Sequence, residues 1–247
     1  MFKTHGKIYE ASASQMFGVP IEKIKKGNPE YELRQKGKVA ELALGYQGGP
    51  GALIQMGALE KGLTEAELPE IVDRWRNSNR RIVDLWGKIQ QASLLCLKTG
   101  RTQAIQKNIY FSLENGNLAI TLPSKRQLFY IKPQITRNQF GSESLSYIGQ
   151  KKKKKKWERI PTYGGKLTEN IVQAIARDCL ANSIKNLVEN GYRVLFHIHD
   201  EVICEVPKND ERFTLENAIK IMCQAPDWAE GLPLNADGFE NDYYKKE

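Results

Sequence analysis

The sequence predicts an α+β fold in which a helical half comes before a region of short antiparallel strands. Apolar residues recur at helical spacing up to about Gly100, and short alternating runs such as Leu118–Leu122 and Gln127–Ile131 follow. A second helical pattern, at 166–190, leads into two apolar runs that meet at a polar tip. Helices first and strands later, with no regular βα alternation, are typical of an α+β chain.

The helical half divides into segments at its Gly, Pro and capping residues. The expected helices cover residues 4–17, 29–47, 52–61 and 64 to about 100. Asn28 is expected to cap the second of them, and Pro29 fits its first position. Thr64 and Glu67 have the spacing of a capping box. We expect the tryptophans of the long fourth stretch to lie in the core.

The second half reads as strands, a helix and an acidic hairpin. Asn115-Gly116 predicts a tight turn between strands, and residues 137–162 are polar, which predicts a hairpin or a loop. The helix 166–190 is followed by the hairpin, and a last helix is expected from about 210 to 223. The long helix is predicted to turn five residues inward: Ile171, Ile175, Cys179, Ala181 and Leu187.

Composition favours a polyanionic partner, with one reservation about where the charge lies. The 247 residues carry a net charge of +8, and the run Lys151–Lys156 supplies six of these charges, which leaves +2 without it. The four cysteines are far apart and are expected to be reduced core thiols. No apolar leader or long apolar run is present, so we expect a cytoplasmic protein without membrane contact.

The polar tip His199-Asp200-Glu201 is the first candidate site. Two adjacent acids at a turn between strands can hold a divalent metal against a phosphate, because Mg²⁺ prefers hard oxygen ligands. An ordinary hairpin with charged turn residues explains the same pattern. A metal site built on His197 and His199 would lack a third ligand.

The helix 29–47 carries the second candidate site. Wound as an α-helix, it places Arg34 and Lys38 one turn apart on the face opposite its apolar residues, together with Gly45. Two such cations can accept a polyphosphate that lies along the helix. A solvated basic face on an amphipathic helix is the alternative.

The two segments together resemble motifs B and C of family A DNA polymerases, the DNA polymerase I type. The pattern Arg34-x3-Lys38-x7-Tyr46-Gln-Gly is followed, about 150 residues later, by the strand-borne His-Asp-Glu. Tyr163-Gly-Gly-Lys-Leu-Thr-Glu-Asn resembles the palm helix of the phage-encoded branch, and the stretches 6–20 and 226–237 resemble its first fingers helix and its C-terminal end. The resemblance covers nearly the whole chain in the family's order.

The resemblance implies a right-hand polymerase with an incomplete palm. It places helical fingers at 1–100, linking strands and the Lys-rich loop at 101–165, and the C-terminal palm with the motif C hairpin at 166–247. The implied activity is template-directed nucleotidyl transfer from a dNTP to a primer 3′-OH by two-metal catalysis with Mg²⁺. The turn Pro123–Arg126 is similar to the family's Leu-Pro-Ser-Gly-Arg turn, but Lys125 stands where Gly is usual.

Residue roles follow from the same resemblance. Asp200 is the implied metal ligand, with Glu201 either an auxiliary ligand or a charged turn residue. The dNTP would meet Arg34, Lys38, Leu42 and Tyr46, and Lys38 could also protonate the leaving pyrophosphate. The primer–template DNA would meet four residues: Gln173, Asn170, His199 and Arg126. The Lys151–Lys156 run is expected to touch phosphate without sequence preference.

One element of the family is expected outside this chain. The motif A strand, Asp-Tyr/Phe-Ser-x-Ile-Glu, is absent from the 247 residues, and the family places it before the first fingers helix. A two-metal site needs carboxylates from two strands. We therefore expect an upstream polymerase segment that carries motif A, and no synthesis by this chain alone. A catalytically dead remnant that binds nucleic acid or nucleotide, and a basic protein unrelated to polymerases, are the alternatives.

Overall fold

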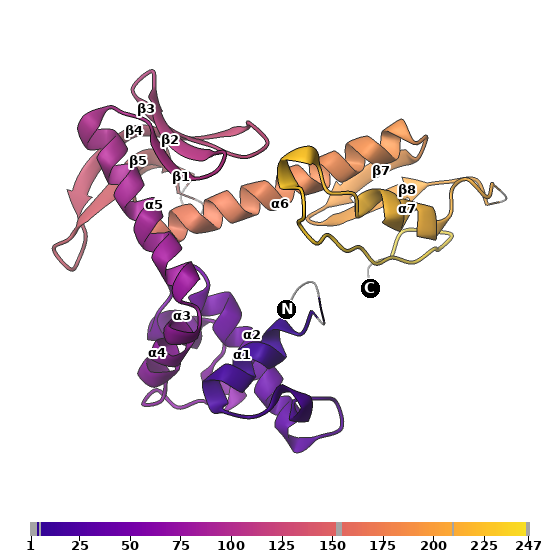
Figure 1. Ribbon diagram of the computed structural model, residues 1–247, viewed down its shortest axis with the longest axis horizontal. Helices are drawn as coiled ribbons and strands as arrows, with labels where there is room; N and C mark the ends of the chain where they lie inside the picture. The colour runs from indigo at the N-terminus through magenta and orange to yellow at the C-terminus, as the bar shows by residue number, and fades with distance from the viewer. Residues whose placement is uncertain (1–3, 5, 152–154, 209, 246–247) are drawn as a thin grey trace. The chain divides into compact units, whose positions relative to one another are not determined.

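The chain folds into two compact units, residues Met1–Ile171 and Val172–Glu247. The computed structural model describes residues 4, 6–151, 155–208 and 210–245, with helices and strands labelled in Figure 1. Helices come first and antiparallel strands follow, so the expected α+β class is confirmed. The division into fingers, linking strands and palm is a division by function and stays a prediction.

Five α-helices and three short 3-10 helices form the first part of unit 1. They are α1 (Ile8–Phe17), η1 (Ile21–Lys23), η2 (Pro29–Glu32), α2 (Leu33–Leu44), α3 (Pro50–Gln55), η3 (Leu59–Lys61), α4 (Leu68–Ser78) and α5 (Arg80–Thr99). Their apolar faces make one core, in which Trp75 and Trp86 stack with ring centroids 6.1 Å apart. The expectation that these tryptophans lie in the core is confirmed.

Three details at the helix ends differ from the prediction. The helix expected at 29–47 is shorter, because Pro29–Glu32 forms a 3-10 turn and α2 ends at Leu44. Asn28 does not cap it, since its Nδ2 donates instead to the carbonyl of Lys23, 3.0 Å away. Thr64 and Glu67 do meet, but the Thr64 hydroxyl and N–H both donate to the Glu67 carboxylate, which lowers the pKa of Glu67.

Helices α1 and α2 cross in close contact at Gly37. A Cβ at Gly37 would lie 3.1 Å from the Cβ of Ala13 and would overlap the carbonyl oxygen of Tyr9. Only a residue without a side chain lets the two backbones approach this closely. This crossing sets the position of α1 against the charged face of α2.

A six-stranded antiparallel sheet follows the helices, with its strands in sequence order. The strands are β1 (Gln103–Gln106), β2 (Ile109–Glu114), β3 (Asn117–Thr121), β4 (Gln127–Arg137), β5 (Glu143–Gln150) and β6 (Trp157–Thr162). Asn115 and Gly116 both have positive φ, 51° and 76°, so the expected tight turn is confirmed. The polar stretch 137–162 holds the β5–β6 hairpin, and residues 152–154 of the lysine run lie outside the described residues.

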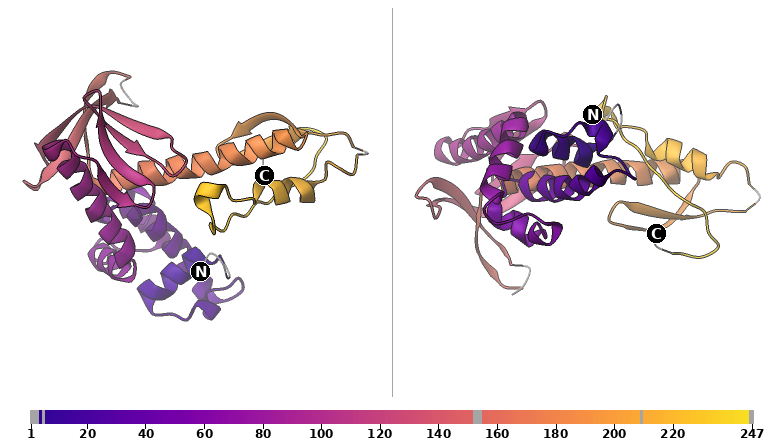
Figure 2. Two further views of the ribbon diagram at one scale, coloured as in Figure 1. Left: turned by 45° about the horizontal axis from the view of Figure 1, so that its top comes forward. Right: turned by 90° about the horizontal axis from the view of Figure 1, so that it is seen from below.

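The two faces of this sheet differ. Helix α5 lies along one face (Figure 2), and several large side chains turned that way are fully buried. Phe111, Leu118, Ile120 and Leu145 are 0% exposed, and by the strand register they share this face. The other face contains partly exposed aromatic side chains.

The turn between β3 and β4 keeps a glycine-type backbone without a glycine. Lys125 N–H donates to the carbonyl of Leu122, 2.8 Å away, and Leu122 N–H donates to the carbonyl of Arg126, 2.9 Å away. Lys125 has φ 69°, in the left-handed region that favours Gly. Lys125 therefore carries a backbone strain that a glycine at this position would not have.

Lys125→Gly is expected to stabilise unit 1. Relief of the left-handed strain contributes about 1–2 kcal/mol, and the greater freedom of Gly in the unfolded chain cancels about half of that. The net gain in the free energy of unfolding should be about 0.5–1 kcal/mol in denaturant titrations. Lys125→Ala is the matched control, because it removes the side chain but keeps the Cβ. An equal gain from both variants would show that the side chain, and not the backbone, is strained.

Unit 2 contains most of the long helix and a two-stranded sheet. Its elements are the second part of α6 (Gly164–Glu189), β7 (Arg193–Ile198), β8 (Glu201–Glu205), α7 (Leu215–Met222) and η4 (Asp227–Ala229). Cys179 and Leu187 of α6 are buried, but Ala181 is exposed, so its predicted inward position is wrong. Ser183 is buried and donates to the carbonyl of Met222. Ala181 lies two residues before it and therefore faces another side of the helix.

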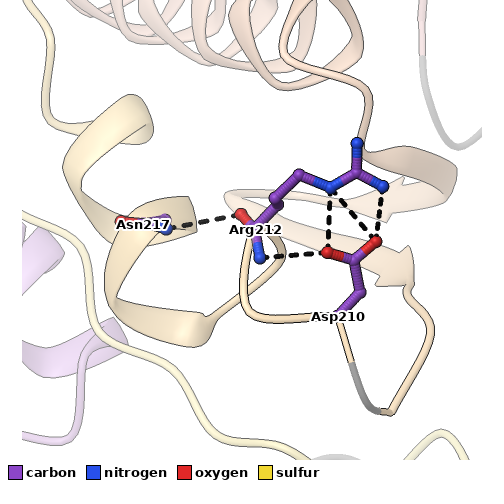
Figure 3. A network of polar contacts seen from close by, with 3 residues as sticks. All are labelled: Asp210, Arg212 and Asn217. Atoms are coloured by element: carbon purple, nitrogen blue, oxygen red, sulfur yellow. Dashed lines mark hydrogen bonds and ion pairs between the residues drawn. The ribbon is translucent and has the colours of Figure 1, made fainter.

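A polar network closes the loop between β8 and α7 (Figure 3). The Asp210 carboxylate accepts hydrogen bonds from Nε, Nη2 and the backbone N–H of Arg212, and Arg212 O accepts from Asn217 Nδ2. The Arg212 guanidinium lowers the pKa of Asp210 to about 2. Thr214 caps α7 by accepting from the N–H of Asn217, 3.2 Å away.

The structure also describes the state of the cysteines and the length and polarity of the helices. All four cysteines are free, as expected; Cys96 and Cys179 are buried, whereas Cys204 and Cys223 are half-buried. Among the described residues, every helix is too short or too polar to cross a bilayer.

Candidate functional site

Helix α2 presents its two predicted cations to α1. The Arg34 guanidinium lies 5.3 Å from the centroid of the Tyr9 ring, and Lys38 Nζ lies 5.9 Å from the same centroid. Arg34 Nε also donates to Glu10 Oε1, 2.9 Å away. The structure therefore brings Arg34 and Lys38 together around one aromatic ring, a contact that also stabilises the cations.

Tyr9 and Glu10 are site residues that sequence reasoning missed. Both belong to α1, and they reach Arg34 only because α1 and α2 cross closely at Gly37. Glu10 balances the charge of Arg34, whose side chain is 29% exposed. Lys38 is exposed, and within the described part of the chain no carboxylate lies at ion-pair distance from it. An anion that reaches this face would meet Lys38 first.

The end of α2 is attached to the start of α6. Gly165 N–H donates to Gln47 Oε1, 2.9 Å away, and a side chain at Gly165 would overlap the backbone of Tyr46. A side chain at Gly164 would likewise overlap the carbonyl of Trp86. The Gly164-Gly165 pair thus lets α6 begin directly on the backbone that follows α2. Tyr46 is half-buried here, and Leu42 is 49% exposed one turn earlier.

Asn170 is held by the sheet rather than left free. Its Nδ2 donates to the Tyr130 hydroxyl, 2.8 Å away, and Tyr130 packs edge-on against Tyr147. Burial of Tyr130 raises the pKa of its hydroxyl to about 12. Gln173, one turn further along α6, is exposed. Of these two predicted minor-groove residues, Asn170 already uses part of its amide within the fold.

Tyr130 should make the protein sensitive to alkali. Its folded pKa, about 12, lies above the ordinary value of 10, so the stability it supports is complete below pH 10 and is lost as the pH rises toward 12. A shift of this size corresponds to roughly 2–3 kcal/mol. Tyr130→Phe is expected to remove that part of the loss between pH 10 and 12, while costing about 1 kcal/mol at pH 7 through the lost hydrogen bond. Melting curves of both proteins against pH measure the difference; parallel curves would contradict it.

The acidic tip lies at a two-residue turn between β7 and β8. Ile198 pairs with Glu201, so His199 and Asp200 form the turn. His199 has φ 51°, a conformation that Gly usually supplies at the first position of such turns. The side chains of His199, Asp200 and Glu201 are all exposed. The turn therefore projects its carboxylates into solvent.

The tip alone does not form a complete metal site with the side chains that the structure describes. Among the residues that the structure describes, no three His, Cys, Asp or Glu side chains are grouped as metal ligands. His197 Nε2 lies 3.2 Å from Arg177 Nη2, and a nearby cation opposes metal binding by that histidine. Asp200 and Glu201 can supply hard oxygen ligands, which suits Mg²⁺, but only part of a set.

The predicted residues are divided between the two units. Unit 1 holds Arg34, Lys38, Leu42, Tyr46, Arg126 and Asn170, and unit 2 holds Gln173, His199, Asp200 and Glu201. Arg126 is exposed, directly after the left-handed Lys125. Within unit 1 the structure brings Arg34 and Lys38 together at Tyr9, and it brings Gln47 into contact with the start of α6.

Comparison with known proteins gives one informative match. The chain is 53% identical over 248 aligned residues to the DNA polymerase of Bacillus phage SP02. The match covers 100% of this chain. It covers 37% of the length of that curated relative. No family model matches the chain.

Proposed function

We propose that this chain is part of a DNA-directed DNA polymerase of the family A type, which acts in the cytoplasm of a bacterial or phage-infected cell. The observation that carries the proposal is the 53% identity, along the whole chain, to a protein named DNA polymerase. The α2 cations and the acidic tip support it, because nucleotidyl transfer needs groups that bind phosphate and carboxylates that bind metal. The reaction would join a dNTP to a primer 3′-OH under direction of a template.

The α2 face is the proposed dNTP site. A triphosphate would pair with Lys38, which is exposed, and would compete with Glu10 for the guanidinium of Arg34. Lys38 is the group placed to donate a proton to the leaving pyrophosphate. Tyr46 would stack on the nascent base pair, and Leu42 would lie near the sugar. Because Glu10 holds Arg34 when no nucleotide is bound, it keeps the guanidinium on the phosphate side of α2.

The tip of the β7–β8 hairpin is the proposed metal-binding end. Asp200 would hold Mg²⁺, with Glu201 as a further oxygen donor or a contact to the primer end. When bound, the ions would lower the charge of the phosphates and help to deprotonate the primer hydroxyl. A second carboxylate strand, of the motif A type, would have to lie beside this hairpin and would come from a further polypeptide segment.

The β7–β8 hairpin itself supports the need for a third strand. A two-stranded sheet is marginal by itself, and Leu195 and Phe196 are more than 40% exposed. A neighbouring strand would pair a free row of backbone groups and cover apolar surface. The upstream segment should therefore raise the solubility of the chain as well as its activity.

The proposed DNA contacts come from both units: Asn170 and Arg126 from unit 1, and Gln173 and His199 from unit 2. Gln173 and Asn170 would donate to minor-groove acceptors, which are similar for all base pairs and so report shape rather than sequence. His199 would lie near the primer end. Arg126 would contact the phosphate backbone.

Primer extension tests the proposal. The purified chain, a separate polypeptide with the motif A strand, and the two co-expressed are each given primed DNA, dNTPs and Mg²⁺. We expect template-directed synthesis only from the co-expressed pair, together with a gain in solubility. Strong synthesis by the chain alone, abolished by Asp200→Ala, would mean that the second carboxylate comes from within it. DNA binding with no synthesis in any combination would favour the alternative, a catalytically dead nucleic-acid-binding remnant.

A further inference from the structure

The positive charge of the protein is concentrated in the sheet region. Residues 101–162 hold thirteen Lys and Arg and three Glu, a net charge of +10, whereas the whole chain has +8. The rest of the chain is therefore slightly acidic. Part of this charge is the lysine run, but seven of the thirteen cations lie elsewhere in the strands and turns. The partner of this region is expected to be a polyanion.

The face of the sheet that α5 does not cover displays aromatic side chains. The register places Tyr110, Phe129 and Trp157 on it, from β2, β4 and β6. Phe129 is 52% exposed and Trp157 is 64% exposed. We call this surface the aromatic face, defined by Tyr110, Phe129, Ile131, Trp157 and Arg159.

Phe129 and Trp157 lie in one row across this face. Trp157 pairs with Gln150 of β5, and Ile131 pairs with Ile148 of β5, so that Gln150 falls beside Phe129 when the register is extended by two residues. One strand lies between the two that carry the rings, so the backbones of Phe129 and Trp157 are roughly 10 Å apart. Flat rings at this spacing on an open sheet form a surface on which bases can stack.

Cations flank the rings. Arg159 pairs with Ile148 and donates through Nη1 to the carbonyl of Lys132 and to Ser146 Oγ, both 3.2 Å away. Lys132 lies at a bulge in β4 with φ 47°, and its side chain is exposed. Lys155 and Lys156 come directly before Trp157 and are exposed. The register therefore places the Arg159 guanidinium on the aromatic face. The Lys132 backbone contacts it, and the other two lysines come next to Trp157 along the backbone.

The carboxylate of Glu114 on this face accepts hydrogen bonds from neutral side chains. Glu114 Oε1 accepts from Ser112 Oγ, 2.9 Å away, and from Gln127 Nε2, 2.6 Å away. The register places the other two acids of the region, Glu143 and Glu158, on the opposite face. An approaching phosphate therefore meets mainly cations and rings.

We propose that the aromatic face binds single-stranded DNA, with bases stacked on Phe129 and Trp157 and phosphates near Arg159, Lys132 and the adjoining lysines. A duplex keeps its bases stacked inside and could use only the cations, whereas unpaired bases can also use the rings. The site lies outside the proposed dNTP and metal sites, and it stands on the sheet alone, whether or not the chain takes part in synthesis.

Binding of a fluorescent oligothymidine to the full chain, followed by anisotropy, tests the proposal. Phe129→Ala and Trp157→Ala should each weaken binding about 5- to 100-fold, the range that loss of one stacked base gives. Phe140→Ala is the matched control: Phe140 is 81% exposed but lies in the turn between β4 and β5, and its loss should change affinity less than twofold. Unchanged thermal melting of the three variants confirms that they fold.

The second arm separates stacking from charge. Arg159→Gln should reduce the slope of log affinity against log salt, because fewer counterions are released. A duplex of the same sequence length should bind more weakly and should not respond to Phe129→Ala. Equal losses for single strand and duplex, or no loss in either ring variant, would overturn the proposal. Primer extension by the co-expressed polymerase on a template with only a short 5′ overhang should be unchanged in the ring variants, so a failure here is distinct from a failure of the proposed synthesis.

Discussion

Asp200→Asn is expected to reduce primer extension by the co-expressed polymerase by about 10³-fold or more. A metal-binding carboxylate contributes several kcal/mol to the transition state, and each 1.36 kcal/mol is a factor of ten in rate. Asn keeps the shape of the side chain but loses the charge that would hold Mg²⁺. Single-turnover rates at saturating dNTP, compared with the wild-type protein, measure the effect.

The position of Asp200 makes this variant easy to interpret. Its side chain is exposed at the turn, so the substitution should leave the melting temperature unchanged. Glu211→Gln, an exposed acid in the loop before α7, is the charge-matched control and should retain full activity. Glu201→Gln tests the role of Glu201. Primer extension should fall more than about tenfold if Glu201 is a metal ligand, and only slightly if it is a charged turn residue. Near-normal synthesis by Asp200→Asn would exclude this carboxylate from the metal site.

Gly37→Ala should destabilise unit 1 by about 2 kcal/mol or more, since the overlap puts the cost at the upper end of the overpacking range. The added Cβ would overlap the Tyr9 carbonyl and press on Ala13, so α1 and α2 must move apart. Overpacking of this kind costs about 1–3 kcal/mol and sometimes more, against a gain of about 1 kcal/mol in helix propensity. Separation of the helices would also break the contacts of Arg34 with Tyr9 and Glu10.

Gly87→Ala is the matched control for this prediction. Gly87 lies in the middle of α5, and a Cβ there meets nothing within 4 Å. It should stabilise the protein by about 1 kcal/mol through helix propensity alone. Thermal melting and nucleotide binding of both variants give the comparison. A Gly37→Ala protein as stable as Gly87→Ala would show that α1 and α2 can separate without cost.

Local signals account for the elements that the sequence predicted well. Gly18 and Gly100 end their helices in the left-handed conformation, and Asn115-Gly116 turns between β2 and β3. These features depend on the conformational preferences of a few adjacent residues. The errors are also local: Asn28 makes no capping hydrogen bond, and its amide donates instead to the carbonyl of Lys23, five residues earlier.

The candidate site divides in the same way. The four-residue spacing of Arg34 and Lys38 on one helix face follows from helix geometry, and the turn position of Asp200 follows from the pattern of the flanking strands. The sequence by itself thus determined the α+β class, the order of the elements and which charged residues share an element. Each of these depends on contacts within a few residues of the chain.

Only the tertiary structure decided which distant residues meet. Glu10 and Tyr9 reach Arg34 because two helices cross at Gly37, and Gly165 rests on Gln47, 118 residues away. The uncovered face that carries Phe129 and Trp157 exists because α5 covers the other side of the sheet. Such contacts depend on how whole elements pack. The hydrophobic periodicity and composition of a short stretch carry no information about that packing. No local pattern could therefore have revealed these contacts.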